Sequence, residues 1–334
     1  MKKFLARTLA LTLFASILTG CHSAPAQNAA DPAISTSTRE KPLKIVTTIF
    51  PEYDWVRQIL GEKAADAEIT LLLDNGVDLH SFQPTANDMI RLSDCDLFIY
   101  VGGESDSWVD KALKNSANKD KTVIDLMEVL GDSAKAEELV EGMQPEVHSH
   151  DHEEEAEYDE HIWLSLRNAK TLVNAISGAL QKLDPANQEL YAANTSAYLQ
   201  KLSALDADYQ AAVSSASQDT ILFGDRFPFR YLADDYGLHY YAAFAGCSAE
   251  TEASFETISF LAQKMDELHL PCVLTIEGTQ HKIAETIVQN TAEKNQPVFT
   301  MDSMQAVTSA DAANGTTYLS VMESNLSILK QALA

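Results

Sequence analysis

The sequence has little cysteine and few positive charges. Its four cysteines include no Cys-x-x-Cys pair, so neither a thiolate zinc cluster nor a thioredoxin-type site is predicted. Lysine and arginine together number 24 against 49 aspartates and glutamates, which gives a formal net charge of −25. Nucleic acid and anionic membrane surfaces would repel such a chain, so we expect no nucleic-acid partner. A cation is the kind of partner that this charge favours.

The sequence begins with a short apolar run. Lys2, Lys3 and Arg7 precede it, and residues 9–18 are mostly apolar, but the run is shorter than the roughly 20 residues that span a bilayer. We predict that residues 1–20 are a secretory signal peptide. The Leu-Thr-Gly-Cys segment that ends at Cys21 resembles a bacterial lipobox, in which the cysteine is lipidated and becomes the new N-terminus. An uncleaved anchor and a plain signal are the alternatives.

Residues 21–42 contain almost no bulky apolar side chain. After Cys21, Ile34 is the exception among small and polar residues, and such a segment cannot bury enough surface to offset the entropy lost on ordering. We predict a flexible tether that holds a soluble body at a bacterial membrane, outside the cytoplasm. Loss of residues 1–20 removes three positive charges, so the exported chain carries a net charge of −28.

Three further cysteines lie in the body of the chain. Cys95 and Cys272 lie at or near the starts of apolar runs, where a small buried thiol is expected. Cys247 is the third. Export permits a disulfide, but the number of cysteines is odd, so their pairing stays open.

The folded body begins at residue 43 and is long enough for two domains. Continuous apolar strands alternate with amphipathic helical patterns in two sets, which indicates parallel sheets covered on both faces. The 46% content of hydrophobic residues is sufficient for packed cores. The expected strands are residues 44–49, 69–73, 97–101 and 122–124, then 220–223, 240–244, 272–276 and 298–301. The expected helices include residues 53–60, 86–92, 256–268 and 283–294.

A long helix is predicted between the two sets of strands. Asp184 followed by Pro185 is a helix-start signal, and no glycine or proline then occurs until beyond Ser215. One face carries Leu190, Tyr191, Tyr198, Leu202, Leu205 and Tyr209. We expect one helix of roughly 30 residues, about 45 Å long, acting as a stiff spacer; two helices with a break are the alternative.

The predicted fold class is therefore α/β, with two βα lobes of mainly parallel sheet joined by one long α-helix. The expected parts are an N-terminal lobe at residues 43–183, a linking helix at residues 184–217 and a C-terminal lobe at residues 218–334.

Two histidines lie where ligands are expected. His80 follows the second expected strand and precedes a helix that begins near Thr85, and the carboxyl ends of strands in open α/β sheets line ligand crevices. His161 lies where an acidic segment meets the apolar residues Ile162, Trp163 and Leu164, which predicts a partly buried, fixed imidazole. A surface-loop histidine and a structural core histidine are the respective alternatives.

Residues 144–160 form a low-complexity segment. Three alternating histidines, His148, His150 and His152, are interleaved there with eight carboxylates (Glu146, Asp151, Glu153, Glu154, Glu155, Glu157, Asp159 and Glu160). Imidazole and carboxylate donors bind divalent metal ions, so we predict a mobile metal-capture loop. An incidental solvated charge run is the alternative.

These motifs, in this order, resemble those of the zinc- and manganese-binding solute receptors of bacterial ABC importers, the family with a rigid lobe-joining helix. The segment Asp78-Leu-His-Ser-Phe-Gln-Pro-Thr85 is similar to the family's first histidine motif, and Asp159-Glu-His-Ile-Trp-Leu164 is similar to the second. Asp184-Pro185 resembles the start of the joining helix, and residues 246–254 resemble the segment that enters the second lobe's core. The resemblance covers residues 43–334.

The resemblance implies a metal site between the lobes. His80 and His161 match the first-lobe ligands, and Asp302 matches a second-lobe carboxylate. The family's remaining ligand is a histidine or glutamate after the first strand of the second lobe, but this sequence has neither there. Asp225 is the nearest candidate, either as a ligand or paired with Arg226. Glu277 and His281 are weaker candidates.

The resemblance further implies function. The protein is expected to capture a divalent transition metal and deliver it to an ABC importer permease, as a monomer without enzymatic activity. Two imidazoles with carboxylates suit Zn²⁺ and accept Mn²⁺, and we favour zinc because of the histidine-rich loop. Metal affinity is expected to fall below about pH 6.5, since the imidazoles must be neutral.

Two rival functions remain. One is a metal-dependent surface adhesin. The other is a secreted metallohydrolase, which needs an open metal position and a general base, although the sequence contains no His-Glu-x-x-His motif.

Overall fold

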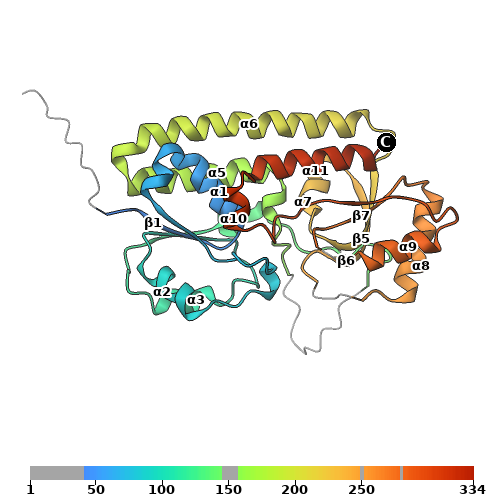
Figure 1. Ribbon diagram of the computed structural model, residues 1–334, viewed down its shortest axis with the longest axis horizontal. Coiled ribbons are helices and arrows are strands. Elements are labelled where there is room, and N and C mark those ends of the chain that lie inside the picture. The colour runs from blue at the N-terminus through green and yellow to red at the C-terminus, as the bar shows by residue number, and fades with distance from the viewer. Residues whose placement is uncertain (1–40, 145–156, 249–251, 279–280) are drawn as a thin grey trace, which may run out of the picture. The chain divides into compact units, whose positions relative to one another are not determined.

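Two four-stranded parallel sheets form the core of the protein (Figure 1). The computed structural model describes residues 41–144, 157–248, 252–278 and 281–334, all of which belong to one compact unit. The first sheet contains β1 (Lys44–Thr47), β2 (Glu68–Leu71), β3 (Leu97–Tyr100) and β4 (Thr122–Asp125). The second contains β5 (Thr220–Phe227), β6 (His239–Ala245), β7 (Val273–Thr275) and β8 (Val298–Thr300).

Helices connect the strands and cover the sheets. In the first half of the chain these are α1 (Phe50–Leu60), α2 (Ala86–Asp94), α3 (Val109–Lys114), α4 (Leu126–Leu130) and α5 (Leu166–Leu183). They are followed by α6 (Gln188–Ser215), α7 (Arg230–Tyr236), α8 (Phe255–Glu267), α9 (Lys282–Asn290), α10 (Ser309–Ala313) and α11 (Tyr318–Ala332). Short 3₁₀ turns include η2 (Leu79–Ser81), η4 (Ile162–Leu164) and η5 (Pro185–Asn187). Among the described helices, none is long and apolar enough to cross a membrane.

Both sheets have the same doubly wound topology. The strand orders are β2-β1-β3-β4 and β6-β5-β7-β8, and every pairing is parallel. In each sheet the order in which strands are added reverses beside the first strand, between β1 and β3 and between β5 and β7. Open α/β sheets bind ligands in the crevice outside the carboxyl ends of the strands at such a point. The loops that follow β2, β3, β5, β7 and β8 therefore lie where a ligand site is expected.

The eight strands expected from the sequence are all present, which confirms the predicted α/β class. The main departure is β5, which continues to Phe227 instead of ending near Phe223. Its pairing with β6 shifts register between Phe223 and Arg226, as a bulge does when it redirects a side chain. The helix expected over residues 283–294 also ends earlier, at Asn290.

The long helix is one continuous element, as predicted. Helix α6 spans 28 residues, about 42 Å at 1.5 Å per residue, and it packs against α5, α1, α11 and α7. Asp184 precedes the 3₁₀ turn η5, which Pro185 begins, and its side chain makes no capping hydrogen bond. The Asp184 carboxylate instead accepts hydrogen bonds from Asn187 and from the Tyr191 hydroxyl, each at 2.7 Å.

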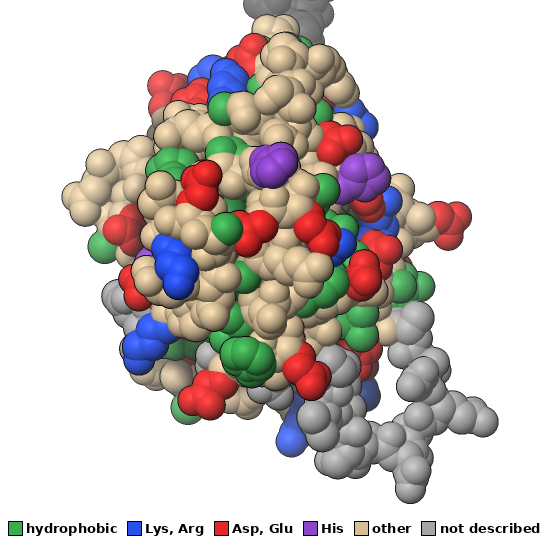
Figure 2. Space-filling view, turned by 90° about the vertical axis from the view of Figure 1, so that its right-hand side faces the viewer, with side chains coloured by type: hydrophobic (Ala, Val, Ile, Leu, Met, Phe, Trp, Pro, Cys, Tyr) green, Lys and Arg blue, Asp and Glu red, His purple; other side chains and the backbone are tan. Residues whose placement is uncertain are grey.

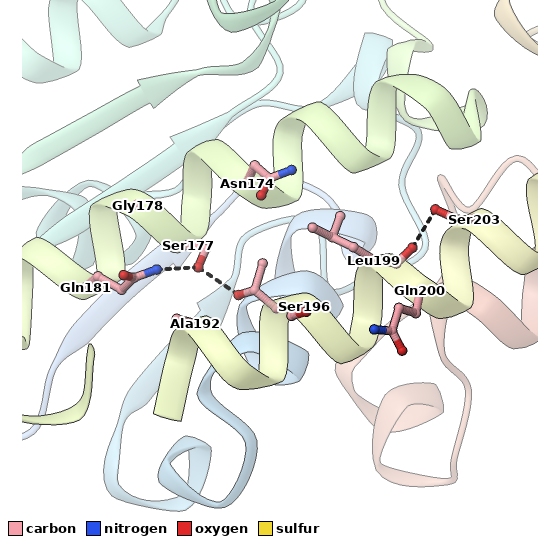
Figure 3. A pocket seen from close by; sticks show the side chains of 10 residues that line it. Asn174, Ser177, Gly178, Gln181, Ala192, Ser196, Leu199, Gln200 and Ser203 are labelled. Atoms are coloured by element: carbon pink, nitrogen blue, oxygen red, sulfur yellow. Dashed lines mark hydrogen bonds between the residues drawn. The ribbon is translucent and has the colours of Figure 1, made fainter. Parts of the chain in front are cut away.

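Polar side chains also join α5 to α6. Figure 3 shows the groove between these two helices, where the Ser177 Oγ lies 2.7 Å from the Thr195 Oγ1 and accepts a hydrogen bond from Gln181. Thr195 is a polar interruption of the apolar face, and this bond satisfies its buried hydroxyl. The spacer is thus a helix held along its length by neighbouring helices.

The C-terminal helix ties the second half of the chain to the first. The Tyr318 hydroxyl donates to the Trp163 carbonyl oxygen at 2.6 Å, and the Tyr318 N–H donates to Asp54 at 3.0 Å. The Tyr318 and Trp55 rings pack edge to face, 5.2 Å between centroids. These buried contacts link residues more than 150 positions apart, so the region around Trp163 is rigidly held.

On one face of the molecule the negative charge is dispersed. Figure 2 shows one face, at the end of the molecule that carries α8 and α9, where acidic side chains lie scattered among polar ones. Charge distributed in this way favours solubility.

Two acids are buried at the carboxyl end of the first sheet. The Glu52 carboxylate accepts hydrogen bonds from the backbone N–H groups of Thr48 and Ile49 at the start of α1. Asp106, only 3% exposed, accepts one from the Gly102 N–H at 3.1 Å, and its Oδ1 atom has no hydrogen-bond partner. Burial, reinforced by the charge of Glu160, raises the pKa of Asp106 to about 7.

We expect Asp106→Asn to stabilise the metal-free protein at alkaline pH. Between pH 3.8 and about 7 the folded state retains a proton on Asp106 that the unfolded chain releases, so this carboxyl costs stability as pH rises through that window. The amide cannot ionise, and the variant should be more stable than the parent by about 4 kcal/mol at pH 8. The difference should vanish near pH 4. Urea unfolding at the two pH values measures it.

Asp120→Asn is the matched control, because Asp120 is exposed. It should change the free energy of unfolding equally at both pH values. An equal loss of stability at both pH values in Asp106→Asn would contradict the account of this buried acid.

Candidate metal centre

His161 is fully buried and held in one orientation. It precedes the turn η4, and its side chain is 0% exposed, as its apolar neighbours predicted. Its Nδ1 lies 2.9 Å from the Asp159 Oδ1, which also accepts the His161 backbone N–H. Asp159 is itself buried, and its carbonyl oxygen accepts a hydrogen bond from the Tyr231 hydroxyl. With Nδ1 engaged in this way, Nε2 is the atom left to bind a ligand.

The base of this segment is fixed by strand-like pairing. Ala136 and Tyr158 form an isolated antiparallel bridge, and the Asp159 N–H donates to the Lys135 carbonyl oxygen at 2.9 Å. The residues just before His161 therefore have a defined position although they follow the low-complexity segment.

His80 lies on η2, after β2, and is held by similar contacts. The Asp78 carboxylate accepts its backbone N–H at 2.9 Å. Its Nδ1 lies 2.9 Å from the Ser105 Oγ and 3.5 Å from the Glu160 Oε2. Gly103 has a φ of +80°, and a Cβ there would meet the Glu160 Oε1 at 2.4 Å, so the buried Glu160 needs a glycine beside it.

The two Nε2 atoms converge. They lie 3.3 Å apart, and two nitrogens bound to one tetrahedral zinc ion lie about 3.3–3.4 Å apart at Zn–N distances near 2.0–2.1 Å. If both Nδ1 atoms donate to their oxygen neighbours, two lone pairs face each other across this gap. A cation between them relieves that repulsion, so the pair fits a metal ion.

Burial keeps the His80 imidazole neutral. Desolvation and the neighbouring His161 lower the pKa of His80 to about 3. A metal ion competes with protons for an imidazole only near or below its pKa. Protonation of His80 should therefore weaken metal binding only at a pH well below the value of about 6.5 expected from the sequence.

The predicted carboxylate ligands lie at the carboxyl ends of the second sheet. Asp302 follows β8, and burial together with the charge of Glu277 raises its pKa to about 6. Its Oδ1 accepts the Met304 N–H at 2.7 Å. Glu277 follows β7 and accepts hydrogen bonds from Ser303 and Gln305, so its oxygens hold the loop that bears Asp302.

Asp225 lies in the bulge of β5. It accepts hydrogen bonds from the backbone N–H groups of Arg226 and Ile276. His281 lies at the start of α9. All four candidates thus lie within β5 or in segments that follow strands of the second sheet.

Arg226 pairs with Asp78, not with Asp225. Its guanidinium donates to the Asp78 Oδ2 at 2.5 Å and to the Ser248 carbonyl oxygen at 3.3 Å. The suggested Asp225–Arg226 ion pair is therefore wrong. Although burial raises it, the pKa of Asp78 is lowered overall by the charge of Arg226. The second lobe thus contacts the loop that carries His80 through an arginine.

The structure adds one residue that the sequence did not single out. Within the described parts of the chain, the group of three metal-competent side chains whose ligand atoms all lie within 4.8 Å of one another is His80, His161 and Cys247. None of the four candidates on the second sheet belongs to this group. Cys247 follows β6, and the rule that drew attention to His80, a side chain after a parallel strand, applies to it equally.

Two sets of predicted residues lie outside the described residues. These are the lipidation candidate Cys21 and the capture-loop histidines His148, His150 and His152.

Known proteins share this architecture and sequence. The family profile described as zinc-uptake complex component A, periplasmic, matches residues 45–332. The zinc-binding lipoprotein AdcA of Streptococcus pneumoniae is 32% identical over 292 residues, which cover 86% of this chain and 55% of that protein. The high-affinity zinc uptake system protein ZnuA of Bacillus subtilis is 27% identical over 307 residues, 90% of each chain.

A solved structure of a related domain has the same fold. The Zn(II)-bound ZnuA-like domain of Streptococcus pneumoniae AdcA superposes with a TM-score of 0.67 at 28% identity, covering 87% of this chain and 99% of that one. This chain spans about half the length of AdcA. Because the family profile matches most of the sequence, this chain belongs to the zinc-uptake complex component A family.

Proposed function

We propose that the protein captures a divalent transition metal outside the cytoplasm and delivers it to the permease of an ABC importer. The observation that carries this proposal is the pair of buried imidazoles whose Nε2 atoms lie 3.3 Å apart. Zinc is the first candidate and manganese the second, because imidazole nitrogen is a borderline donor that suits Zn²⁺. The names of AdcA and ZnuA as zinc-binding and zinc-uptake proteins support zinc.

His80 and His161 are the central ligands of this proposal. Asp302 is the first choice among the second-lobe donors, because its loop contacts the turn that follows His161. The Trp163 Nε1–H donates to the Ser303 carbonyl oxygen at 2.8 Å, and the Trp163 and His161 rings are 5.2 Å apart. Asp225 is the second choice as the second-lobe ligand, and Glu277 and His281 are weaker candidates.

Capture and release follow from this arrangement. A metal ion entering between the lobes neutralises the facing imidazole lone pairs and draws the second-lobe carboxylate towards it. Helix α6 is packed against helices of both lobes, which limits rotation, so release takes place through small shifts of the loops after the strands. The histidines His148, His150 and His152 of the segment 144–160 bind metal loosely and raise its local concentration.

The cellular setting of the proposal comes from the N-terminus. Residues 1–20 serve as the signal peptide, Cys21 carries the lipid, and residues 21–42 tether a monomeric body to the bacterial membrane. A relative is named a lipoprotein. Members of the family are described as a component of a zinc-uptake complex. We propose no enzymatic activity for this protein.

We expect His80→Ala and His161→Ala each to lose tight zinc binding. Each change removes one of two converging nitrogens, and the affinity should fall by about 100-fold or more, since loss of an outer-shell partner alone costs 10–100-fold. Competition calorimetry with a chelator measures the affinity. His239→Ala is the control, because His239 is an exposed histidine on β6. Unchanged zinc affinity in the double variant would refute the site.

We expect Asp302→Asn to weaken zinc binding about 10–100-fold, and more than Asp225→Asn does. The amide keeps the size of the side chain and can still accept the Met304 N–H, so the loop should retain its position. The same calorimetric competition compares the two variants. A larger loss of zinc affinity in Asp225→Asn than in Asp302→Asn would identify Asp225 on β5 as the second-lobe ligand.

We expect deletion of the gene to stop growth in chelated medium, with rescue by added zinc. Import requires the protein when free metal is scarce, whereas growth in chelated medium does not require adhesion. Growth of the deletion strain, complemented with the wild-type chain or with the His80/His161 double variant, measures this. Normal growth without the protein in chelated medium would favour the adhesin.

A further inference from the structure

We infer that the Cys247 thiol is a third protein ligand of the metal, so that the bound ion has a mixed nitrogen and sulfur environment. This inference rests on the proposed metal-binding function and adds a second ligand from the second lobe beside Asp302. It concerns a position that the sequence motifs leave unassigned.

The distances carry the inference. The Cys247 Sγ and one ring nitrogen each of His80 and His161 lie within 4.8 Å of one another. A sulfur and a nitrogen bound to the same tetrahedral zinc lie about 3.6 Å apart, given Zn–S near 2.3 Å and Zn–N near 2.0–2.1 Å. A side-chain shift of about 1 Å therefore brings all three donors to bonding distance.

The backbone of the second lobe places Cys247 against the histidines. Gly246 lies directly on the His161 ring, since a Cβ there would come within 3.1 Å of Nδ1 and 3.2 Å of Cε1. The same Cβ would meet the Phe227 carbonyl oxygen at 2.9 Å. Only glycine permits this approach, and the residue that follows it is thereby held beside the imidazole pair.

The partly buried Glu137 carboxylate anchors the cysteine to the first-lobe segment. The Cys247 N–H donates to the Glu137 Oε1 at 2.8 Å. The Glu137 N–H in turn donates to the Glu157 carbonyl oxygen at 2.7 Å, two residues before Asp159. The cysteine and His161 are thus held by adjacent parts of the same paired segment.

Metal binding converts the thiol to a thiolate, because the thiolate is the form of cysteine that ligates a metal ion. A cysteine thiol has an ordinary pKa of about 8.5 and is therefore protonated at neutral pH. On binding, the S–H bond breaks, the proton passes to solvent, and the sulfur electron pair forms the bond to Zn²⁺, so one proton is released per ion bound.

A thiolate ligand also bears on which metal is carried. Soft sulfur donors favour zinc over manganese, which prefers carboxylate, carbonyl and water oxygens. Two imidazoles and one thiolate leave one position of a tetrahedral zinc shell for Asp302. The inferred site is consequently one for zinc.

Cobalt(II) titration of the purified protein tests the inference. Cobalt bound to a thiolate gives an intense charge-transfer band in the near ultraviolet, which nitrogen and oxygen ligands do not produce. We expect this band to saturate at one equivalent in the parent and in Cys272→Ala, whose thiol is buried in the core. It should be absent from Cys247→Ser, in which zinc affinity falls about 10–100-fold or more.

Calorimetry in buffers of different ionisation enthalpy gives a second readout. Zinc binding should release one proton fewer in Cys247→Ser than in the parent. Cys247→His should recover much of the zinc affinity without the charge-transfer band, because it restores a donor and not the sulfur. A folding defect would instead weaken both variants alike, and circular dichroism would show it.

The results separate this inference from the proposed function. If Cys247→Ser binds zinc as the parent does and no charge-transfer band forms, while His80→Ala loses binding, the thiol is not a ligand and the metal-binding function stands. If His80→Ala also binds as the parent does, the proposed function itself fails.

Discussion

The short contact between the His161 Nδ1 and the Asp159 carboxylate, 2.9 Å, is the constraint on which the metal centre depends. It sets the ring orientation, so that Nε2 points at the Nε2 of His80. A buried imidazole without such a partner would be free to turn its polar atoms towards other groups. Asp159 is in turn held by strand-like pairing and by Tyr231, so the orientation of one ring is enforced by three separate segments.

The two lobes meet at this point through polar groups. The Ser303 carbonyl oxygen of the second lobe accepts a hydrogen bond from the Trp163 Nε1–H. The Arg226 guanidinium, also of the second lobe, binds the Asp78 carboxylate. Each contact touches a residue within two positions of a histidine of the pair. Movement of the second lobe is thereby transmitted to the ligands, and this coupling suits a site that must both hold and release its ion.

The acidity of the chain has two different consequences. Over the exposed face of Figure 2 the carboxylates are dispersed and favour solubility. Around the histidines, Asp159 and Glu160 are buried and Glu137 is partly buried, and buried anions favour the entry of a cation. Arg226, by contrast, neutralises Asp78 and adds a positive charge close to His80.

The sequence by itself determined the eight strands, the long helix and the two histidines. Strands and helices were predictable because continuous apolar runs and helical spacing are local patterns, and His80 and His161 lie in short motifs beside them. Tertiary structure alone decided that Arg226 pairs with Asp78, 148 residues away, and that Cys247 lies beside both histidines. No local pattern predicts such neighbours, because they arise only when separate sheets bring their loops together, and a one-residue bulge such as that in β5 is enough to redirect a side chain.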